Sequence, residues 1–360
     1  MKEVRIGIVG ATGMVGQNYI TLLRNHPWFK ITFLSASSKS AGKSYKEAVD
    51  LRWLMKTPLE KKVADLMVFD AEDVDAAVKN CDLIFSAVEM EKSKVALLEE
   101  QFAQAGLAVI SNNSAHRSTS DVPMIIPEVN ADHMNIIPIQ QKNRGWKKGF
   151  IAVKPNCSIQ SYMTPLFALI NSGYEIEKLI VTTLQAVSGA GYPGVPSLDI
   201  VDNIIPLIRG EEEKTEKEPL KILGSISENQ IILNEKIKIS AHCNRVGVTD
   251  GHTACVSVKF KNQVPDTKEI IRLWENFKSY PQDKKLPFAP ERPIIYNYEE
   301  NRPQPLKDRD SDKGMAVTVG RLRSCNVFDY RFVGLSHNTI RGAAGGAILV
   351  AELAVSQGYI

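Results

Sequence analysis

The chain has 360 residues, which predicts two domains, because a domain usually holds about 100–200 residues. Its composition, 44% hydrophobic and 24% charged, is that of a globular protein, and a formal net charge of +3 gives no electrostatic case for binding nucleic acid or a membrane. Five scattered cysteines argue against a disulfide framework and favour a reducing cytosol. We expect no signal peptide and no membrane span, since the most apolar late segment, Ala343 to Val355, contains Glu352 and is shorter than the about 20 residues that a bilayer requires.

The first part of the chain alternates expected strands and helices. The strands are Val4–Val9, Ile31–Ala36, Leu83–Ala87 and Ala108–Ser111, and the helices are Thr12–Asn25, one that ends at Ala76–Asn80, and Lys92–Ala105. Strands separated by helices predict an α/β fold with a parallel, doubly wound sheet of Rossmann type.

After about residue 149 the pattern changes to longer strands with alternating apolar residues. These strands are expected at Leu179–Ala186, Ile237–Ala241, Thr253–Phe260 and Ala316–Arg321. They predict an α+β domain with a mixed or antiparallel sheet, one face packed and the other available to a partner or a second subunit. The proline-rich segment Leu286–Pro305 is expected to be a loop or lid. The segment Thr339–Val355 is expected to be a helix that packs back on the first domain.

A glycine-rich loop follows the first expected strand and opens the first helix. Its glycines allow a tight turn, close approach of the backbone to a pyrophosphate, and close packing of helix on strand. The helix N-terminus then favours the phosphate charge. The residues expected to form this dinucleotide site are Gly10, Thr12, Gly13, Met14, Val15 and Gly16.

The end of the second expected strand lacks the acidic residue that usually holds the ribose 2′-hydroxyl of NAD. Hydroxyl side chains and a lysine stand there instead, and they suit a 2′-phosphate. These residues are Ser35, Ser37, Ser38 and Lys39. NADP is therefore the expected cofactor, and use of both NADP and NAD stays open.

A second motif, Pro155-Asn156-Cys157-Ser158, lies where the two patterns meet. The residues that follow, Ile159 to Ile170, predict a helix whose dipole would stabilise a thiolate on Cys157. A thiolate adds to an aldehyde to give a thiohemiacetal, and loss of hydride from it leaves a thioester that a second nucleophile cleaves. Cys81 and Cys325 are interpreted as core residues, as free cysteines commonly are.

Several motifs in the same order resemble the aspartate-semialdehyde dehydrogenase family, most closely its archaeal and fungal-type branch. They lie at Gly7–Gly16, Pro155–Ser158, Thr183–Gly191, Arg245–His252 and Arg341–Gly345, and so run almost from end to end. The resemblance implies a glyceraldehyde-phosphate-dehydrogenase-like fold, with an NADP-binding domain of residues 1–155 with 339–360 and a catalytic and dimerisation domain of residues 156–338. It also implies an NADP-dependent oxidoreductase of amino-acid biosynthesis that forms a cytoplasmic homodimer or homotetramer.

The resemblance assigns catalytic roles around the cysteine. Cys157 would be the nucleophile, and His252 would take its proton and later assist proton movement at the carbonyl oxygen, as an imidazole that titrates near neutral pH can do. Gln185 would orient the intermediate. Asn156, or backbone near Cys157, would stabilise the oxyanion.

The resemblance also assigns substrate contacts. Arg245 would hold the substrate carboxylate, since a planar guanidinium makes two parallel hydrogen bonds to it. Glu211 would hold the substrate amino group and Lys214 would help to bind phosphate, although on sequence alone these two residues also fit an ordinary charged helix face. Arg117 would bind phosphate, with Asn113 as a weaker companion.

Three further residues are expected at the cofactor. Ser188 and Gly189 would lie near the nicotinamide, and Asn338 would contact the cofactor as well. We expect no metal site. Although His252 and Cys255 stand close in sequence to His242 and Cys243, Cys255 should point to the opposite face of its strand from His252.

Together these roles give a mechanistic hypothesis. Aspartyl phosphate acylates Cys157 and releases phosphate to Arg117 and Lys214, NADPH reduces the thioester, and His252 assists release of L-aspartate 4-semialdehyde, at the branch point toward lysine, threonine, methionine and isoleucine. Two alternatives stay open: a malonyl-CoA reductase of the same fold, which takes a CoA thioester and needs no phosphate site, and a non-catalytic NADP-binding regulator.

Overall fold

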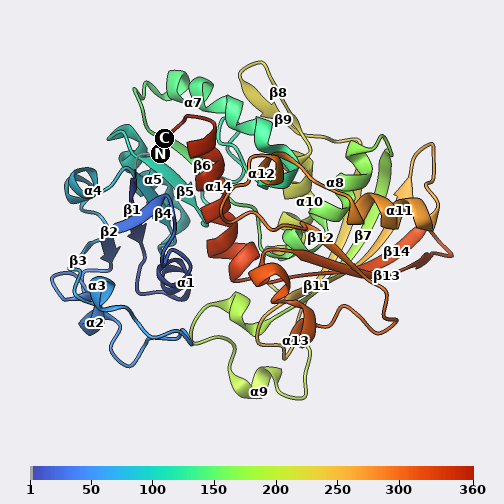
Figure 1. Ribbon diagram of the computed structural model, residues 1–360, viewed down its shortest axis with the longest axis horizontal. Coiled ribbons are helices and arrows are strands. Elements are labelled where there is room, and N and C mark those ends of the chain that lie inside the picture. Colours follow the sequence, from blue (N-terminus) through green and yellow to red (C-terminus); the bar gives the residue numbers. More distant parts are fainter. Residues whose placement is uncertain (1–2) are drawn as a thin grey trace.

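Two six-stranded sheets, described over residues 3–360 of a computed structural model, form the frame of the molecule (Figure 1). Helix α14 lies near the middle of the molecule, and the two chain ends lie close together. Within residues 3–360, no helix combines the length and apolarity needed to cross a bilayer.

The first sheet has the strand order β3-β2-β1-β4-β5-β6, and every pairing in it is parallel. Its strands are β1 Val4–Val9, β2 Phe29–Ala36, β3 Val68–Asp70, β4 Leu83–Ser86, β5 Ala108–Ser111 and β6 Phe150–Val153. Its helices are α1 Met14–Leu22, α2 Tyr45–Ala48, α3 Lys61–Ala64, α4 Val74–Asn80, α5 Lys92–Gln104, α6 Pro127–Asn130, η1 Ala131–Ile136 and α7 Ile137–Arg144. This order is that of dinucleotide-binding doubly wound folds, so the prediction of a Rossmann-like sheet is confirmed.

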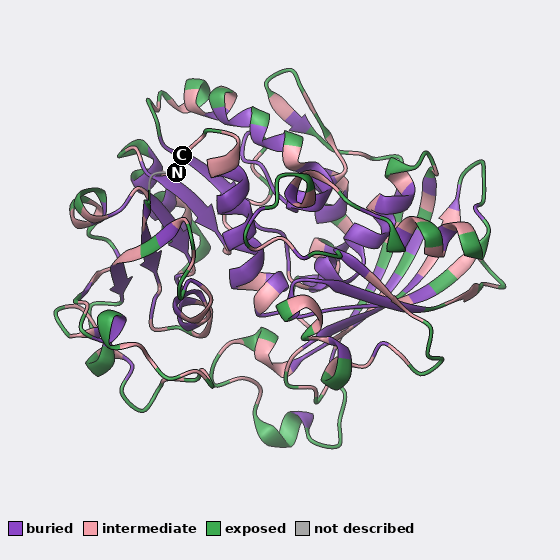
Figure 2. Cartoon of the chain, in the orientation of Figure 1, coloured by how far each residue is buried: buried purple, intermediate pink, exposed green. Residues whose placement is uncertain are grey.

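The second sheet has the order β10-β7-β11-β14-β13-β12 and is mixed, since β10 runs parallel to β7 and β12 parallel to β13. Its strands are β7 Ile176–Gln185, β10 Lys238–Arg245, β11 His252–Phe260, β12 Ile294–Asn297, β13 Val317–Ser324 and β14 Tyr330–Ser336. The other elements of this part are η2 Ser158–Ser161, α8 Met163–Asn171, η3 Val187–Ala190, α9 Ser197–Ile200, α10 Glu211–Ile222, the hairpin β8 Ser225–Ser227 and β9 Gln230–Ile232, α11 Thr267–Glu275, α12 Tyr280–Asp283, α13 Pro305–Asp308 and η4 Ser311–Gly314. Buried and exposed residues alternate along β7, so one face is packed and the other is open (Figure 2).

Three expectations about local structure need correction. The segment Leu286–Pro305 is not a loop throughout, because Ile294–Asn297 forms edge strand β12 beside β13; four residues are too few to show an alternating pattern. The helix expected at Ile159–Ile170 is a 3-10 turn followed by α8. The C-terminal helix is interrupted as well: a π-helical turn, η5 Ile340–Ala344, precedes α14 Gly345–Ser356.

Helix α14 belongs to the hydrophobic core of the first sheet. Residues 345–354 are all buried, and the apolar ones among them pack with strands β1, β4, β5 and β6 (Figure 2). The one carboxylate in this stretch, Glu352, has partners that offset the cost of burying it. It lies 2.7 Å from Nε2 of His26 and accepts the N–H of Phe288 at 3.0 Å. The C-terminal helix therefore packs on the first domain as expected, whereas the domain boundaries at residues 155/156 and 338/339 stay a prediction.

Candidate active site

The glycine loop after β1 is shaped by contacts that exclude side chains. Gly10 has φ +86°, and a Cβ there would lie 2.5 Å from the carbonyl oxygen of Ala87. A Cβ on Gly16 would lie 2.6 Å from the Cα of Ala11, so α1 packs directly on the loop. The N-terminus of α1 has no side-chain cap, which leaves its first N–H groups available to an anion.

A cavity of about 300 Å³ lies at the carboxyl ends of β1, β2 and β4, where doubly wound sheets bind ligands. Six of the expected cofactor residues line it, namely Gly10, Thr12, Gly13, Met14, Val15 and Ser37. Arg52, which the sequence did not single out, lines it too and is exposed. A glycine cradle beside a helix N-terminus and a guanidinium suits the phosphates of a dinucleotide.

The remaining residues expected at the 2′-phosphate take other positions. Ser35 is fully buried, and its carbonyl oxygen accepts the N–H groups of Gly10 and Ala11 at 2.9 Å each. Its backbone therefore fixes the start of the glycine loop to the end of β2. Ser38 and Lys39 are exposed and do not line the cavity. Their contact with a cofactor stays a prediction.

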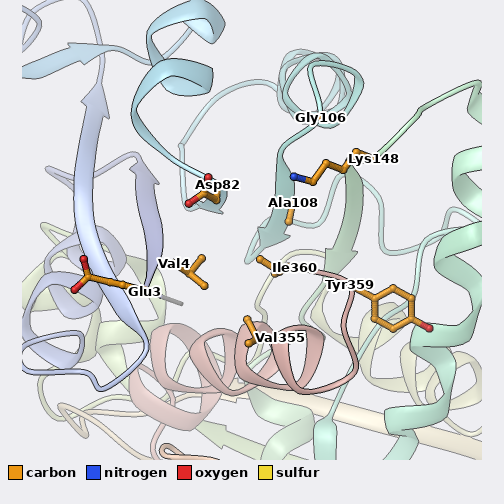
Figure 3. A pocket seen from close by; sticks show the side chains of 9 residues that line it. All are labelled: Glu3, Val4, Asp82, Gly106, Ala108, Lys148, Val355, Tyr359 and Ile360. Carbon is orange, nitrogen blue, oxygen red and sulfur yellow. The ribbon is translucent and has the colours of Figure 1, made fainter. Parts of the chain in front are cut away.

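A second cavity, of about 310 Å³, opens at the opposite edge of the first sheet (Figure 3). It is lined by Glu3, Val4 and Asp82 at the amino ends of the strands, and by the chain's last residue, Ile360. None of the expected nucleophile, acid/base or phosphate-binding residues lines it, so it takes no part in the candidate site.

Cys157 follows β6 and precedes η2. It is partly exposed, and a Cβ on Gly342 would lie 2.8 Å from its own Cβ, which explains why the motif near the C-terminus carries a glycine there. The pKa of the Cys157 thiol is raised above its ordinary value, first by burial and then by the charge of Glu211, and the cations Lys154, Arg117 and Arg245 oppose this only in part. The expected helix dipole is therefore not the main influence, because only a four-residue 3-10 turn follows Cys157.

His252 begins β11 and is completely buried. Its Nδ1 accepts the backbone N–H of Ala186 at 3.0 Å, and its Nε2 has no hydrogen-bond partner. Burial, and then the neighbouring Arg245, lower the pKa of His252 to about 3. The ring is therefore neutral, and because Nδ1 is an acceptor, the ring proton is on Nε2.

Arg245 ends β10 and lies beside Gln185 at the end of β7. Its Nη1 donates to the carbonyl oxygen of Ala186 at 2.8 Å, and the N–H of Ala186 donates to His252, so the backbone of one residue holds both side chains. A Cβ on Gly189 would lie 2.8 Å from Nη1 of Arg245 and 3.1 Å from Nε2 of His252. Three residues predicted from two separate motifs, Thr183–Gly191 and Arg245–His252, thus meet at one point.

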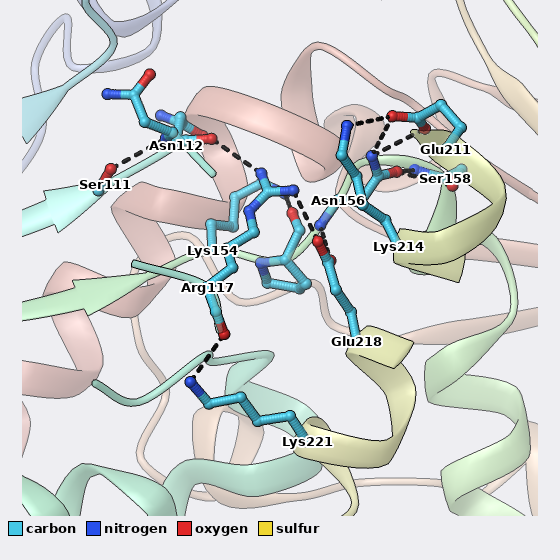
Figure 4. Close-up of polar contacts among 12 residues, drawn as sticks. Ser111, Asn112, Arg117, Lys154, Asn156, Ser158, Glu211, Lys214, Glu218 and Lys221 are labelled. Atoms are coloured by element: carbon cyan, nitrogen blue, oxygen red, sulfur yellow. Dashed lines mark hydrogen bonds and ion pairs between the residues drawn. The ribbon is translucent and has the colours of Figure 1, made fainter. Parts of the chain in front are cut away.

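Glu211, the first residue of α10, gathers a second group of predicted residues (Figure 4). The two carboxylate oxygens each accept from Nδ2 of Asn156 at 2.9 Å. One also accepts from Nε2 of Gln185 at 3.2 Å, and the other from Nζ of Lys214 at 2.9 Å. The carboxylate therefore joins the nucleophile motif to the far end of β7.

Arg117 lies on the loop after β5 with two of its nitrogens engaged. Nη1 donates to Glu218 at 3.0 Å and Nη2 to the carbonyl oxygen of Asn112 at 2.9 Å, whereas the buried Nε has no partner (Figure 4). The neighbouring Asn113 donates from Nδ2 to Ser86 and Glu99, at 3.0 Å each, and so attaches this loop to β4 and α5. A phosphate contact by Asn113 stays a prediction.

Asn338 organises the loops around His252. Its Nδ2 donates to the hydroxyl of Ser188 at 2.8 Å, and its Oδ1 accepts the N–H of Gly251 at 2.8 Å. Both ends of the Asn338 side-chain amide therefore bind protein groups. A contact between Asn338 and the cofactor stays a prediction.

The strand β11 alternates as expected: His252 is buried and Cys255 is exposed, so the two side chains do not converge. Within residues 3–360, no group of three His, Cys, Asp or Glu side chains is placed to hold a metal ion.

Three buried charged residues near this site were missed from the sequence: Lys154, Glu218 and Lys221. Glu218 and Lys221 lie about two and three helical turns after Glu211, on the same face of α10, so their spacing was a usable signal. Lys154 donates from Nζ to the carbonyl oxygen of Pro155 at 2.8 Å, and burial lowers its pKa to about 7. No motif distinguishes it from a surface lysine.

Comparison with known proteins agrees with this geometry. Two family models match the chain, "Semialdehyde dehydrogenase, NAD binding domain" over residues 5–137 and "Semialdehyde dehydrogenase, dimerisation domain" over residues 166–341. The aspartate-semialdehyde dehydrogenase of Archaeoglobus fulgidus is 45% identical over 355 residues, which are 99% of each chain. That of Aspergillus fumigatus is 43% identical over 362 residues, 99% of this chain and 98% of the relative.

This chain belongs to the aspartate-semialdehyde dehydrogenase family. The resemblance to its archaeal and fungal-type branch is thereby confirmed. A crystal structure of aspartate semialdehyde dehydrogenase with NADP from Candida albicans matches with a TM-score of 0.90 at 38% identity, and the match covers 100% of both chains. A structure of aspartate semialdehyde dehydrogenase II from Vibrio cholerae matches with a TM-score of 0.77 at 25% identity, covering 99% of this chain and 100% of that chain. The predicted fold class is confirmed as well.

Proposed function

We propose that this chain is an NADP-dependent aspartate-semialdehyde dehydrogenase, which reduces L-aspartyl 4-phosphate to L-aspartate 4-semialdehyde and releases phosphate. This step leads toward lysine, threonine, methionine and isoleucine. One observation carries the proposal. A partly exposed thiol lies among cations, and two buried donors, Nε of Arg117 and Nε2 of His252, have no protein partner. Buried donors are almost always satisfied, so these two mark positions that substrate oxygens take.

In the first step Cys157 gives up its thiol proton to solvent, and the thiolate sulfur attacks the acyl carbon of aspartyl phosphate, which is a mixed anhydride of a carboxylic acid and phosphoric acid. The carbon–sulfur bond forms, the bond from carbon to the phosphate oxygen breaks, and phosphate leaves with that electron pair. Arg117 and Lys214 receive the phosphate. Arg245 holds the α-carboxylate and Glu211 the amino group, which places the acyl carbon beside the thiolate.

In the second step the thioester becomes an aldehyde. NADPH, when bound in the glycine-lined cavity, supplies a hydride to the carbonyl carbon. The Nε2–H of His252 donates to the carbonyl oxygen as negative charge develops there. Collapse of that tetrahedral adduct breaks the carbon–sulfur bond and returns Cys157 as a thiolate, so hydride and thioester give aldehyde and thiolate without a net proton.

This assignment changes the role expected for His252. To take the thiol proton, Nε2 would need a free lone pair, and the ring would then carry its proton on Nδ1. The N–H of Ala186 points at Nδ1 and would face that proton, which is a donor–donor conflict. The geometry therefore supports His252 as a hydrogen-bond donor to the reacting oxygen.

The assembly and location belong to the same proposal. The open face of the second sheet exposes Ile180 on β7, His242 on β10 and Cys255 on β11, and it offers a surface to a second copy in a homodimer or homotetramer. Ser37 and Arg52 line the cofactor cavity, and their hydroxyl and guanidinium groups suit the 2′-phosphate of NADP. A catalytic thiol and free cysteines suit the reducing cytoplasm.

The reverse reaction tests the proposal. Purified enzyme is given aspartate semialdehyde and NADP⁺ with phosphate, with arsenate, or with coenzyme A, and NADPH is followed by absorbance. We expect turnover that depends on phosphate or arsenate and stays at background with coenzyme A. Turnover that needs coenzyme A would favour the malonyl-CoA reductase alternative, and absence of turnover under all three conditions would favour the non-catalytic regulator.

A further inference from the structure

Helix α10 presents four charged residues toward the active site, at Glu211, Lys214, Glu218 and Lys221 (Figure 4). The first two are the substrate contacts proposed above. The other two have no role in the proposed chemistry, although both are among the most buried charged residues of the chain: Glu218 is 6% exposed and Lys221 is 5% exposed. Buried charges persist only where they are paired, so their partners indicate what they do.

Glu218 connects two segments that the reaction uses. One carboxylate oxygen accepts from Nη1 of Arg117 at 3.0 Å, and the other accepts the backbone N–H of Asn156 at 2.6 Å. One side chain therefore fixes both the arginine proposed to receive phosphate and the backbone N–H of the residue before the nucleophile Cys157. The two partners are 101 and 62 residues away from Glu218 in sequence. Glu218 therefore sets the position of Arg117 relative to Asn156 through long-range bonds and not through local structure.

Lys221 secures the same arginine from the backbone side. Its Nζ donates to the carbonyl oxygens of Arg117 and Thr119, at 2.8 Å and 2.6 Å. Burial lowers the pKa of Lys221 to about 8. With Nη1, Nη2 and the carbonyl oxygen of Arg117 all engaged, the guanidinium is held in one orientation, and its third nitrogen, Nε, has no protein partner and can donate to an anion.

We propose that Glu218 is a positioning residue that holds the phosphate-binding Arg117 in register with the nucleophile Cys157. It touches neither substrate nor cofactor and acts through Arg117 and the N–H of Asn156. The inference rests on the proposed function. It adds that phosphate affinity and nucleophile placement are coupled through one carboxylate, so that a single change affects both.

The conservative substitution Glu218→Gln tests this coupling. A carboxamide has one oxygen and one NH₂ group, whereas both partners of Glu218 are donors, so the NH₂ group must face either Arg117 or the N–H of Asn156. Steady-state kinetics are measured in the phosphorylating direction, with aspartate semialdehyde, NADP⁺ and phosphate. We expect the KM for phosphate to rise roughly 10- to 100-fold and kcat to fall, since a lost charge-assisted bond has that scale, while the KM for NADP⁺ stays at the wild-type value.

The matched control is Glu213→Gln. Glu213 lies on the same helix, is exposed, and undergoes the same change of charge, so its kinetic constants should be those of the wild type. Glu218→Asp is a second test, in which the charge is kept but the shorter side chain reaches only one partner. Its KM for phosphate should lie between those of the wild type and Glu218→Gln, which gives a result even if the Gln variant does not fold.

Two results would overturn the inference. One is a wild-type KM for phosphate in a folded Glu218 variant. The other is an equal rise in the KM values for phosphate and NADP⁺, which would indicate a general loss of structure. Both differ from failure of the proposed function, in which the wild-type enzyme itself shows no phosphate-dependent turnover.

Discussion

The cofactor cavity and the catalytic pocket share one active site but are built in different ways. The cavity is centred on one short loop, Gly10–Gly16, and on side chains that are absent from it, since Gly10 and Gly16 leave no room for a Cβ. The pocket depends on buried charged side chains brought from distant segments, as in the bonds from Arg117 and Asn156 to Glu218. The difference indicates that damage to the cavity should weaken cofactor binding, whereas damage to the pocket should stop the chemistry.

The strongest test of that separation is Cys157→Ala. We expect turnover to fall by at least about 10⁴-fold, because no other group can form the thioester, while NADP⁺ binding measured by fluorescence or calorimetry is unchanged. Cys325→Ser is the control, since Cys325 is only partly buried and follows β13, outside the candidate site. Substantial turnover by Cys157→Ala would show that the thiol is not the nucleophile.

A smaller effect is expected from Arg245→Lys. The ammonium keeps the charge but cannot make two parallel hydrogen bonds to a carboxylate, and it leaves the carbonyl oxygen of Ala186 without its donor. The value of kcat/KM for aspartate semialdehyde should fall by about 100-fold, with the KM for NADP⁺ unchanged. Arg272→Lys, at an exposed position on α11, serves as the control. A specific rise in the KM for NADP⁺ instead would place Arg245 on the cofactor side.

The same difference explains what the sequence could predict. The glycine loop and the parallel sheet were predictable because each strand, turn and helix signal lies within a few residues, and β1 and β5 begin and end where expected. Cys157 was predicted from the motif around it and from the helix expected after it. That it meets His252 and Arg245 was predictable only through the family resemblance, because no local pattern states that the three residues converge. Their convergence follows from the pairing of β7 with β10 and β11.

Residues whose role depends on long-range partners were missed. The spacing of Glu218 places it on the same helix face as Glu211, but its burial becomes visible only when the loops of Arg117 and Asn156 are folded over it. Arg52 reaches the cofactor cavity from a segment without regular structure, and Lys39, which has the more suggestive sequence position, lies outside the lining. Asn338 and Ser188 were expected at the cofactor, but the hydrogen bond between them, which spans 150 residues, was not expected.

Damage to the cavity is tested by Gly16→Ala, with Gly13→Ala as its matched control. A Cβ on Gly16 would meet the backbone of Ala11 at 2.6 Å, whereas a Cβ on Gly13 would meet only Gly10, at an ordinary 3.5 Å. We expect Gly16→Ala to lower the free energy of unfolding by about 1–3 kcal/mol and to weaken NADP⁺ binding, because α1 must move away from the loop. Gly13→Ala should unfold like the wild type in the absence of cofactor. Equal stability of the two variants would mean that the close packing at Gly16 is not required.

The smallest effect concerns pH. The pKa of His252 is lowered to about 3 in the folded protein from its ordinary 6.5, so the unfolded chain binds this proton more readily than the folded protein does. The stability that neutral His252 contributes is therefore fully present above pH 6.5 and is lost as the pH falls toward 3. Between about pH 7.5 and 5.5 this one group should cost about 1.4 kcal/mol of unfolding free energy.

Denaturant unfolding at these two pH values measures the effect, with His252→Gln as the comparison. The variant should lose less stability than the wild type on acidification, by about that amount. The lowered pKa values of His133 and His337 act in the same direction in both proteins and cancel in the comparison. Identical pH dependence in both proteins would contradict a neutral, buried His252.

The central claim is that Cys157 carries the acyl group, and mass spectrometry tests it most directly. The wild-type enzyme is mixed with aspartate semialdehyde and NADP⁺ in the absence of phosphate, quenched in acid, and digested. The account predicts an aspartyl thioester on the peptide that contains Cys157, which disappears when phosphate is added before the quench. An enzyme that turns over with phosphate but shows no adduct on Cys157, or shows it on another residue, would contradict the account.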